Sequence, residues 1–165
     1  MVEKETKGNI KEIRMDDKIT VRSIAPWLTG FRRILTVGDV SIAPNGVIRL
    51  SREEVLAQGQ SNNKLITGID GAGSHATLYI EDEWTRRELG FDTDEAKQVI
   101  ISKELIKELF DKKTLPAFKK AVKETIITRA EKFGLLNMIK VLKINDYDKI
   151  AFCEEYCGAK LSTVQ

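Results

Sequence analysis

The chain has 165 residues, of which 42% are hydrophobic and 32% are charged, and its formal net charge is +2. This length suits one domain or two small ones, and the hydrophobic content is sufficient for a packed core. The near balance of charge excludes a global field that would draw the protein to nucleic acid or anionic lipid. Any such partner must therefore bind a local patch.

The amino-terminal residues 1–17 alternate in charge and lack the apolar core of a secretory signal. We expect a mobile charged arm, in which Ile10, Ile13 and Met15 are available for burial. No run in the sequence approaches the roughly 18 apolar residues needed to span a bilayer. The sequence therefore predicts a cytoplasmic protein with no membrane partner.

The part of the chain that follows the arm has the pattern of short strands. Ile19 and Val21 alternate with polar residues and predict a first strand from Lys18. The next segment holds Trp27 and is either a kinked strand or a loop that packs this side chain. Residues 40–50 contain Pro-Asn-Gly at their centre, which predicts a hairpin.

A short helix and a second hairpin are expected next. Ser51 and Glu54 have the spacing of a reciprocal capping box, which predicts a helix over residues 52–58. Residues 64–81 combine two β-branched runs with an Asp-Gly turn and predict the central hairpin of the fold. Weaker patterns predict further strands over residues 84–91 and 99–101.

The chain becomes helical after residue 101. Ser102 is placed to cap a helix over residues 103–112, and Thr114 is placed to cap the next helix. Pro116 lies in the first turn of that helix, where it removes no internal hydrogen bond.

Apolar residues then recur at steps of three and four, which predicts one long amphipathic helix from Leu115 to Leu142. Gly134 is a point where this helix could bend. A last helix is expected to begin at Asn145 and to end at Gly158.

Strands followed by helices predict an α+β fold rather than a parallel, doubly wound sheet. We expect a small antiparallel β-domain of hairpins, barrel-like or sandwich-like, over residues 18–101, and a helical region over residues 102–165. The rhythm of residues 36–55, TVGDVSIAPNGVIRLSREEV, resembles small β-domains in assembly or tail proteins of phages and mobile elements. This segment contains no motif that defines a family.

Metal and cofactor chemistry have little support in the sequence. The two cysteines, Cys153 and Cys157, are four residues apart on one expected helix, where two reduced thiols are favoured over a disulfide. The single histidine, His75, lies far from them in sequence, so a complete zinc ligand set is not expected. We predict neither a metal nor a cofactor.

One short cluster carries residue types used in acyl transfer: Asp70, Ser74 and His75. Neighbours in a tight turn usually point apart, so the favoured interpretation is an Asx-type turn at Asp70. A hydrolase or transferase that uses these three residues is kept as a second alternative function.

Nucleic-acid binding is the first alternative, because small β-domains can bind single strands with arginines and aromatic side chains. The candidate residues are Arg22, Arg32, Arg33, Arg49, Arg52, Tyr79, Arg86 and Arg87. Interleaved carboxylates oppose this function by reducing the local positive field.

The favoured function is a non-enzymatic binding or assembly protein that acts through protein contacts, with a protein partner or self-association. We expect the apolar side of the long helix to take part. The candidate interaction residues are Phe118, Val122, Ile126 and Phe133.

Overall fold

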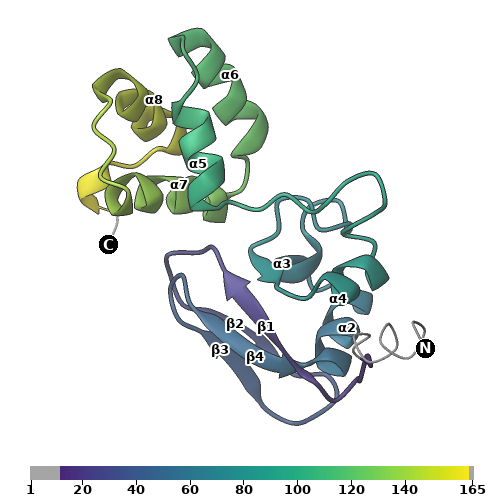
Figure 1. Ribbon diagram of the computed structural model, residues 1–165. Helices are drawn as coiled ribbons and strands as arrows, with labels where there is room; N and C mark the ends of the chain where they lie inside the picture. Colours follow the sequence, from purple (N-terminus) through teal and green to yellow (C-terminus); the bar gives the residue numbers. More distant parts are fainter. Residues whose placement is uncertain (1–11, 164–165) are drawn as a thin grey trace, which may run out of the picture.

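The computed structural model describes residues 12–163 and confirms the α+β class (Figure 1). The strands are β1 (Lys18–Ser23), β2 (Thr29–Arg32), β3 (Asp39–Ile42), β4 (Val47–Ser51) and β5 (Leu78–Ile80). The helices are α2 (Arg52–Gln60), α3 (Lys64–Thr67), α4 (Glu83–Glu88), α5 (Lys103–Phe110), α6 (Leu115–Thr125), α7 (Arg129–Val141), α8 (Tyr147–Cys157) and the 3-10 helix η1 (Leu161–Thr163). In the described part of the chain, no helix is long and apolar enough to cross a membrane.

Two antiparallel sheets form the β-rich half. One has the strand order β4-β1-β5 and the other pairs β2 with β3. In the first sheet, the central residue Val21 lies opposite Ile48 and Ile80. Apolar side chains of both sheets and of α2 and α3 form one cluster, which we call the β-side core. Its fully buried members include Val21, Leu50, Val55, Ile66 and Leu78.

The hairpin predicted over residues 40–50 is wrong, because β3 pairs with β2 and β4 pairs with β1. The Asn45-Gly46 turn explains the difference. Asn45 N–H donates to the carbonyl of Ala25, and Ser23 N–H donates to the carbonyl of Gly46. These bonds direct the chain onto β1 instead of returning it to β3.

The central hairpin predicted over residues 64–81 is also wrong. The Asn63 side chain accepts a hydrogen bond from Leu65 N–H and begins the short helix α3, so the first predicted strand is a helical turn. Only β5 forms a strand here, and its partner is β1. Residues 68–77 connect α3 to β5, and residues 68–75 of this connection form a loop.

The two weaker strand predictions fail for similar reasons. Asp82 caps α4 by accepting from Thr85 N–H, so residues 83–88 are helical. Residues 99–101 make no strand pairing and form the connection to α5 (Figure 1). Ile101 is nevertheless buried, because it packs into the helical half.

The long helix predicted from Leu115 to Leu142 is two helices, α6 and α7, separated at residues 126–128. Ile126 has an extended backbone, and its carbonyl accepts a hydrogen bond from the Tyr156 hydroxyl. Thr128 and Glu131 then form a reciprocal capping box that starts α7. The apolar pattern continues across the break because both helices face the same core. We call this core the helical core, and its buried members include Phe118, Val122, Leu135 and Leu136.

The other helix boundaries largely agree with the sequence. Ser51, Ser102 and Thr114 cap α2, α5 and α6 as predicted. Gly158 ends α8 in a left-handed conformation, as predicted, and Asp146 rather than Asn145 caps its start. The box expected at Ser51 is only half formed, since the Glu54 carboxylate binds the backbone of Ile34 and Leu35.

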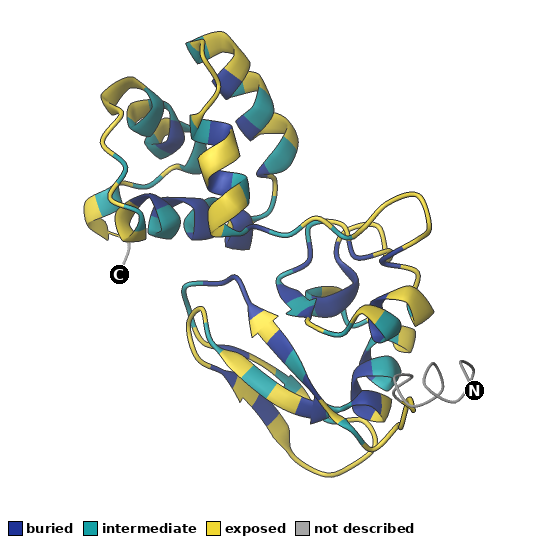
Figure 2. Cartoon of the chain, viewed as in Figure 1, coloured by how far each residue is buried: buried dark blue, intermediate teal, exposed yellow. Residues whose placement is uncertain are grey.

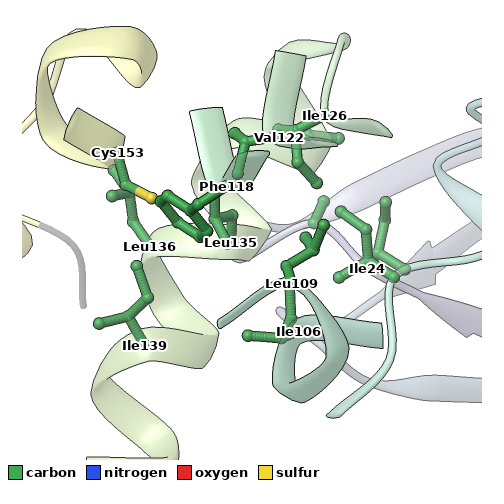
Figure 3. Packing of buried hydrophobic residues seen from close by; sticks show 13 residues of the cluster. Ile24, Ile106, Leu109, Phe118, Val122, Ile126, Leu135, Leu136, Ile139 and Cys153 are labelled. Atoms are coloured by element: carbon green, nitrogen blue, oxygen red, sulfur yellow. The ribbon is translucent and has the colours of Figure 1, made fainter. Parts of the chain in front are cut away.

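The two halves meet along α7. Ile24 and Ala25, which follow β1, insert into the helical core beside Ile106 and Leu109 (Figure 3). Gly134 lies within α7, which continues through it as one helix. It permits close approach of the Ile24 carbonyl, which would lie 3.1 Å from a Cβ at this position.

Burial is concentrated in two groups of residues, one in each half of the chain (Figure 2). A division into domains at residue 102 stays a prediction. Residues 1–11 of the predicted arm, including Ile10, lie outside the described residues. Nearer to β1, the carbonyls of Met15 and Asp17 accept hydrogen bonds from the first amides of α2.

Candidate functional site

The loop of residues 68–75 is held by its own polar groups. The Asp70 carboxylate accepts hydrogen bonds from the amides of Ala72 and Ser74, as expected for an Asx-type turn. Hydrogen bonds from the Ser74 side chain and from Ala72 N–H lower the pKa of Asp70. Gly68 is essential to the closed shape, since a Cβ there would lie 2.1 Å from the Ser74 carbonyl oxygen.

His75 ends this loop and connects it to the helical half. Its backbone is left-handed, with a φ of 57°, which is uncommon for a residue with a side chain. Its Nδ1 atom lies 2.9 Å from each carboxylate oxygen of Glu131. The histidine side chain is 22% exposed and the glutamate side chain 7% exposed, so this pair is largely shielded from water.

Glu131 is fixed from its own side of the contact. Its Oε1 atom accepts hydrogen bonds from the amides of Ile127 and Thr128, each at 3.0 Å. These are donors that the start of α7 would otherwise leave unpaired. The carboxylate therefore caps the start of α7, after the break that follows α6, and it also orients the His75 ring.

A cavity of about 510 Å³ opens beside this pair, between the loop and the helical half. Its apolar wall includes Phe91, Ile100 and Leu105, and His75 and Glu131 form part of its polar wall. The other polar lining residues are Ser74, Thr93, Lys97, Gln98 and, at the end of α6, Glu124 and Thr125.

Gln98 lines the cavity and holds the loop by one end of its amide. Its Nε2 donates to the carbonyl of Gly73 at 2.8 Å, which fixes which end of the amide is the oxygen. Its Oε1 is buried and is the one such side-chain atom within residues 12–163 that has no partner. An unpaired buried acceptor costs about 1–3 kcal/mol.

Gly73 is required where the loop meets the cavity wall. Its φ is +88°, and a Cβ there would lie 2.8 Å from the Phe91 ring and 2.9 Å from Gln98 Nε2. Residue 73 must therefore be glycine for Gln98 to reach the backbone of the loop.

The three residues considered for acyl transfer have different hydrogen-bond partners. Asp70 and Ser74 hydrogen-bond to each other within the loop, while His75 bonds to Glu131 on α7. Glu131, which sequence reasoning missed as a partner of His75, is 56 residues away. The Thr-x-x-Glu spacing of residues 128–131 was the available signal, because it indicated a helix start at this place.

Two of the arginines considered for nucleic-acid binding are buried in ion pairs. Arg52 contacts Asp17 and Asp82, and Arg86 contacts Asp92. These arginine side chains are 4% and 10% exposed, respectively. Their charges therefore stabilise the fold and are not presented to a phosphate backbone.

The remaining candidates lie nearer to solvent. Arg22 pairs with Glu81, Arg32 with Asp39, and Arg87 with Glu83 and Asp94, while Arg33 is half-buried beside the β2–β3 turn.

Three of the predicted residues do share one sheet face. Arg22 lies opposite Tyr79, and Arg49 lies opposite Thr20, two positions before Arg22 on β1. Arg86 covers the Tyr79 ring, with its guanidinium carbon 4.9 Å from the ring centroid. One face of the Tyr79 ring is thus occupied by a side chain of the protein.

Three of the four helix residues considered for protein contact lie inside, and Phe133 is half-buried. Phe118, Val122 and Ile126 are fully buried in the helical core, and Phe133 packs edge-on against Trp27 at a centroid distance of 5.8 Å. Figure 3 shows Phe118 and Val122 facing other core side chains.

The thiols are free, and burial raises the pKa of Cys153 to about 12 and that of Cys157 to about 11. Across residues 12–163, no group of three or more histidine, cysteine and carboxylate side chains is placed to hold a metal ion. Comparison of the chain with protein-family models, with curated proteins and with solved structures gives no match.

Proposed function

We propose that this protein is a binding protein whose ligand occupies the cavity beside His75 and Glu131. The observation that carries the proposal is the His75–Glu131 pair, which joins two distant segments at the cavity wall. An uncommon backbone conformation and a buried, fully bonded carboxylate are both used to fix one histidine ring. Such fixed geometry is typical of sites that bind a ligand.

The size and the lining of the cavity support the same function. Small-molecule sites commonly occupy roughly 300–1,000 Å³ and combine apolar walls with a few polar groups. This cavity has about that volume, with Phe91, Ile100 and Leu105 as apolar surface and Ser74 and His75 among its polar lining. Its position between two packed segments is also a common place for ligand sites.

The test is a fragment titration followed by NMR of ¹⁵N-labelled protein. The panel contains soluble aromatic fragments with cationic, neutral and anionic groups at millimolar concentration. We expect at least one fragment to shift the amides of residues 73–75, 98–101 and 124–131 together, in a saturable manner. A panel that shifts none of these segments would overturn the proposal.

A blocking variant separates cavity binding from surface binding. Val99 lines the cavity but is 67% exposed, so Val99→Trp adds bulk at the opening without disturbing the core. We expect it to abolish the shifts. The matched control is Val47→Trp, an equally bulky change at a half-exposed position on β4 outside the cavity lining, which should leave the shifts unchanged.

A specific observation favours self-association as a second function. The turn between β2 and β3 exposes Ile34, Leu35 and Val37, and the side chain of Val37 is fully accessible. The buried Glu54 carboxylate accepts from the amides of Ile34 and Leu35, and Gln58 binds the carbonyl of Arg32. The turn is therefore held rigid while its apolar side chains face solvent.

The occupant that we propose for this turn is a second copy of the chain. The β2–β3 sheet has only two strands among the described residues, so each strand keeps an edge that could pair with its counterpart. Light scattering should then give a molar mass of more than one chain for the wild-type protein. Val37→Asp should reduce the molar mass to that of a single chain. Tyr147→Asp, at another exposed position, is the control. A wild-type protein with the mass of a single chain would contradict self-association.

A further inference from the structure

We infer that the cavity binds a neutral molecule with an aromatic or hydrocarbon body and a hydroxyl group, and that this hydroxyl donates a hydrogen bond to Nε2 of His75. This inference rests on the proposed function, since it assigns a chemical class to the ligand of the same cavity. It follows from the state in which Glu131 holds the histidine ring.

Glu131 determines which ring nitrogen of His75 carries the hydrogen. Its Oε1 accepts hydrogen bonds from the amides of Ile127 and Thr128, and these donors favour the ionised carboxylate, which has no hydrogen to donate. The Nδ1 atom of His75, 2.9 Å from both carboxylate oxygens, must therefore be the donor in this contact. In the neutral ring the lone pair is then on Nε2, which makes this atom a hydrogen-bond acceptor.

The Nε2 atom of His75 is available to a ligand. No group in residues 12–163 hydrogen-bonds to it, yet the one buried side-chain atom without a partner in this range is Gln98 Oε1. Solvent therefore reaches Nε2, in contrast to Gln98 Oε1. The ring lines the cavity and also a smaller hollow of about 400 Å³ beside Leu65 and Ile69. A fixed acceptor in a cavity wall favours a ligand that brings a donor.

The rest of the lining favours a neutral ligand. Lys97 and Glu124, both at exposed positions, bring one charge of each sign to the cavity and select neither a cation nor an anion. Phe91, Ile100 and Leu105 offer apolar surface to a ring or a hydrocarbon body. Phenol is a small probe that joins a ring to a neutral donor. Anisole, in which a methyl group replaces the hydroxyl hydrogen, is its matched counterpart without a donor.

The first measurement identifies the tautomer of His75. A long-range ¹H–¹⁵N spectrum of the untagged full-length protein reports it directly, because the chain has a single histidine. At about pH 8, above the ordinary histidine pKa of roughly 6.5, we expect the hydrogen on Nδ1 and a bare Nε2. A ring with its hydrogen on Nε2, or a ring that carries both hydrogens at this pH, would overturn the inference.

The second measurement compares the two probes at the same pH. The ¹³C-methyl signals of Ile100 and Leu105 report the cavity, and those of Leu65 and Ile69 report the smaller hollow. We expect phenol to shift the cavity methyls and to bind at least about threefold more tightly than anisole, because one net hydrogen bond has about this effect on an equilibrium.

Glu131→Gln changes the acceptor at His75 into a donor with little change of shape. The amides of Ile127 and Thr128 retain the oxygen of the new side chain, so its NH₂ group faces Nδ1 and the ring hydrogen moves to Nε2. We expect this variant to bind anisole as the wild type does and to lose the preference for phenol. Glu155→Gln, at an exposed position on α8, should keep the preference.

The failures of the two proposals are distinguishable. Equal affinity for phenol and anisole, or a preference for phenol that survives Glu131→Gln, would overturn the hydroxyl class and leave the cavity as a binding site. Tighter binding of benzoate or benzylamine than of phenol, or shifts confined to Leu65 and Ile69, would also overturn it. Failure of the whole fragment panel to reach the cavity would instead overturn the proposed function.

Discussion

The Nδ1 atom of His75 lies 2.9 Å from both carboxylate oxygens of Glu131, a residue 56 positions further along the chain. This contact joins the loop that follows α3 to the first turn of α7. The same carboxylate accepts hydrogen bonds from the amides of Ile127 and Thr128. The histidine is therefore held against the segment that separates α6 from α7.

The first prediction concerns the energy of this contact. In a double-mutant cycle of His75→Asn and Glu131→Gln, we expect a coupling energy of about 1–2 kcal/mol in urea unfolding. Asparagine is chosen because it tolerates the left-handed backbone that residue 75 adopts. A cycle of His75→Asn with the exposed Glu155→Gln is the control and should give no coupling. A coupling energy near zero in the first cycle would show that the pair does not form.

The second prediction separates structural arginines from exposed ones. Arg52 is buried between Asp17 and Asp82, so Arg52→Met leaves two carboxylates without their partner. We expect a loss of about 3 kcal/mol in the free energy of unfolding. Arg49→Met, on the exposed face of β4, should change it by less than about 0.5 kcal/mol. Equal losses would contradict the structural role of Arg52.

The third prediction is a pH dependence at Asp82. Burial opposes ionisation of this carboxyl, but hydrogen bonds from Thr85 and Arg52 outweigh it and lower the pKa below its ordinary value of 3.8. A lowered folded-state pKa stabilises the protein above the unfolded-state pKa, and this stability is lost as the pH falls through the folded-state value. Asp82→Asn should therefore reduce the loss of unfolding free energy below about pH 4. The same steep loss in both proteins would refute this role.

The fourth prediction concerns thiol reactivity. Burial raises the pKa of Cys153 to about 12 and that of Cys157 to about 11, so both are protonated at pH 8. Because the thiolate is the nucleophile, we expect a disulfide reagent to react slowly with native protein and rapidly after denaturation. Fast reaction of either thiol in the native state would contradict the packing of α8.

Local hydrogen-bonding residues made much of the helical half predictable. Ser102 and Thr114 cap their helices as expected, because a hydroxyl that accepts from an amide two or three residues later is a short-range signal. The break before α7 was missed although Thr128 and Glu131 carried the same kind of signal. The apolar periodicity continues across the break, and it led to the prediction of a single helix.

The β-rich half was less predictable because strand pairing is long-range. The Asn45-Gly46 turn was recognised, but its direction depends on backbone bonds to Ser23 and Ala25 in another segment. The short helix α3 was taken as a strand, since Leu65, Ile66 and Thr67 suit either structure and Asn63 decides between them.

The candidate cavity could not be foreseen for the same reason. His75 was noticed as the single histidine, but Glu131 and Gln98 are brought to it only by tertiary packing. The apolar residues Phe118 and Val122 were taken for an interaction surface, whereas they fill the helical core. A helix face that is apolar in sequence does not reveal whether its partner belongs to the same chain.

The most direct test of the account is the measurement of intermolecular NOEs between the protein and an aromatic fragment that shifts the cavity amides, at saturating ligand. The account predicts NOEs from the aromatic protons of the fragment to side chains of Phe91, Ile100 and Leu105, with none in Val99→Trp. Saturable binding whose NOEs come from residues outside the cavity, or that persists unchanged in Val99→Trp, would contradict it.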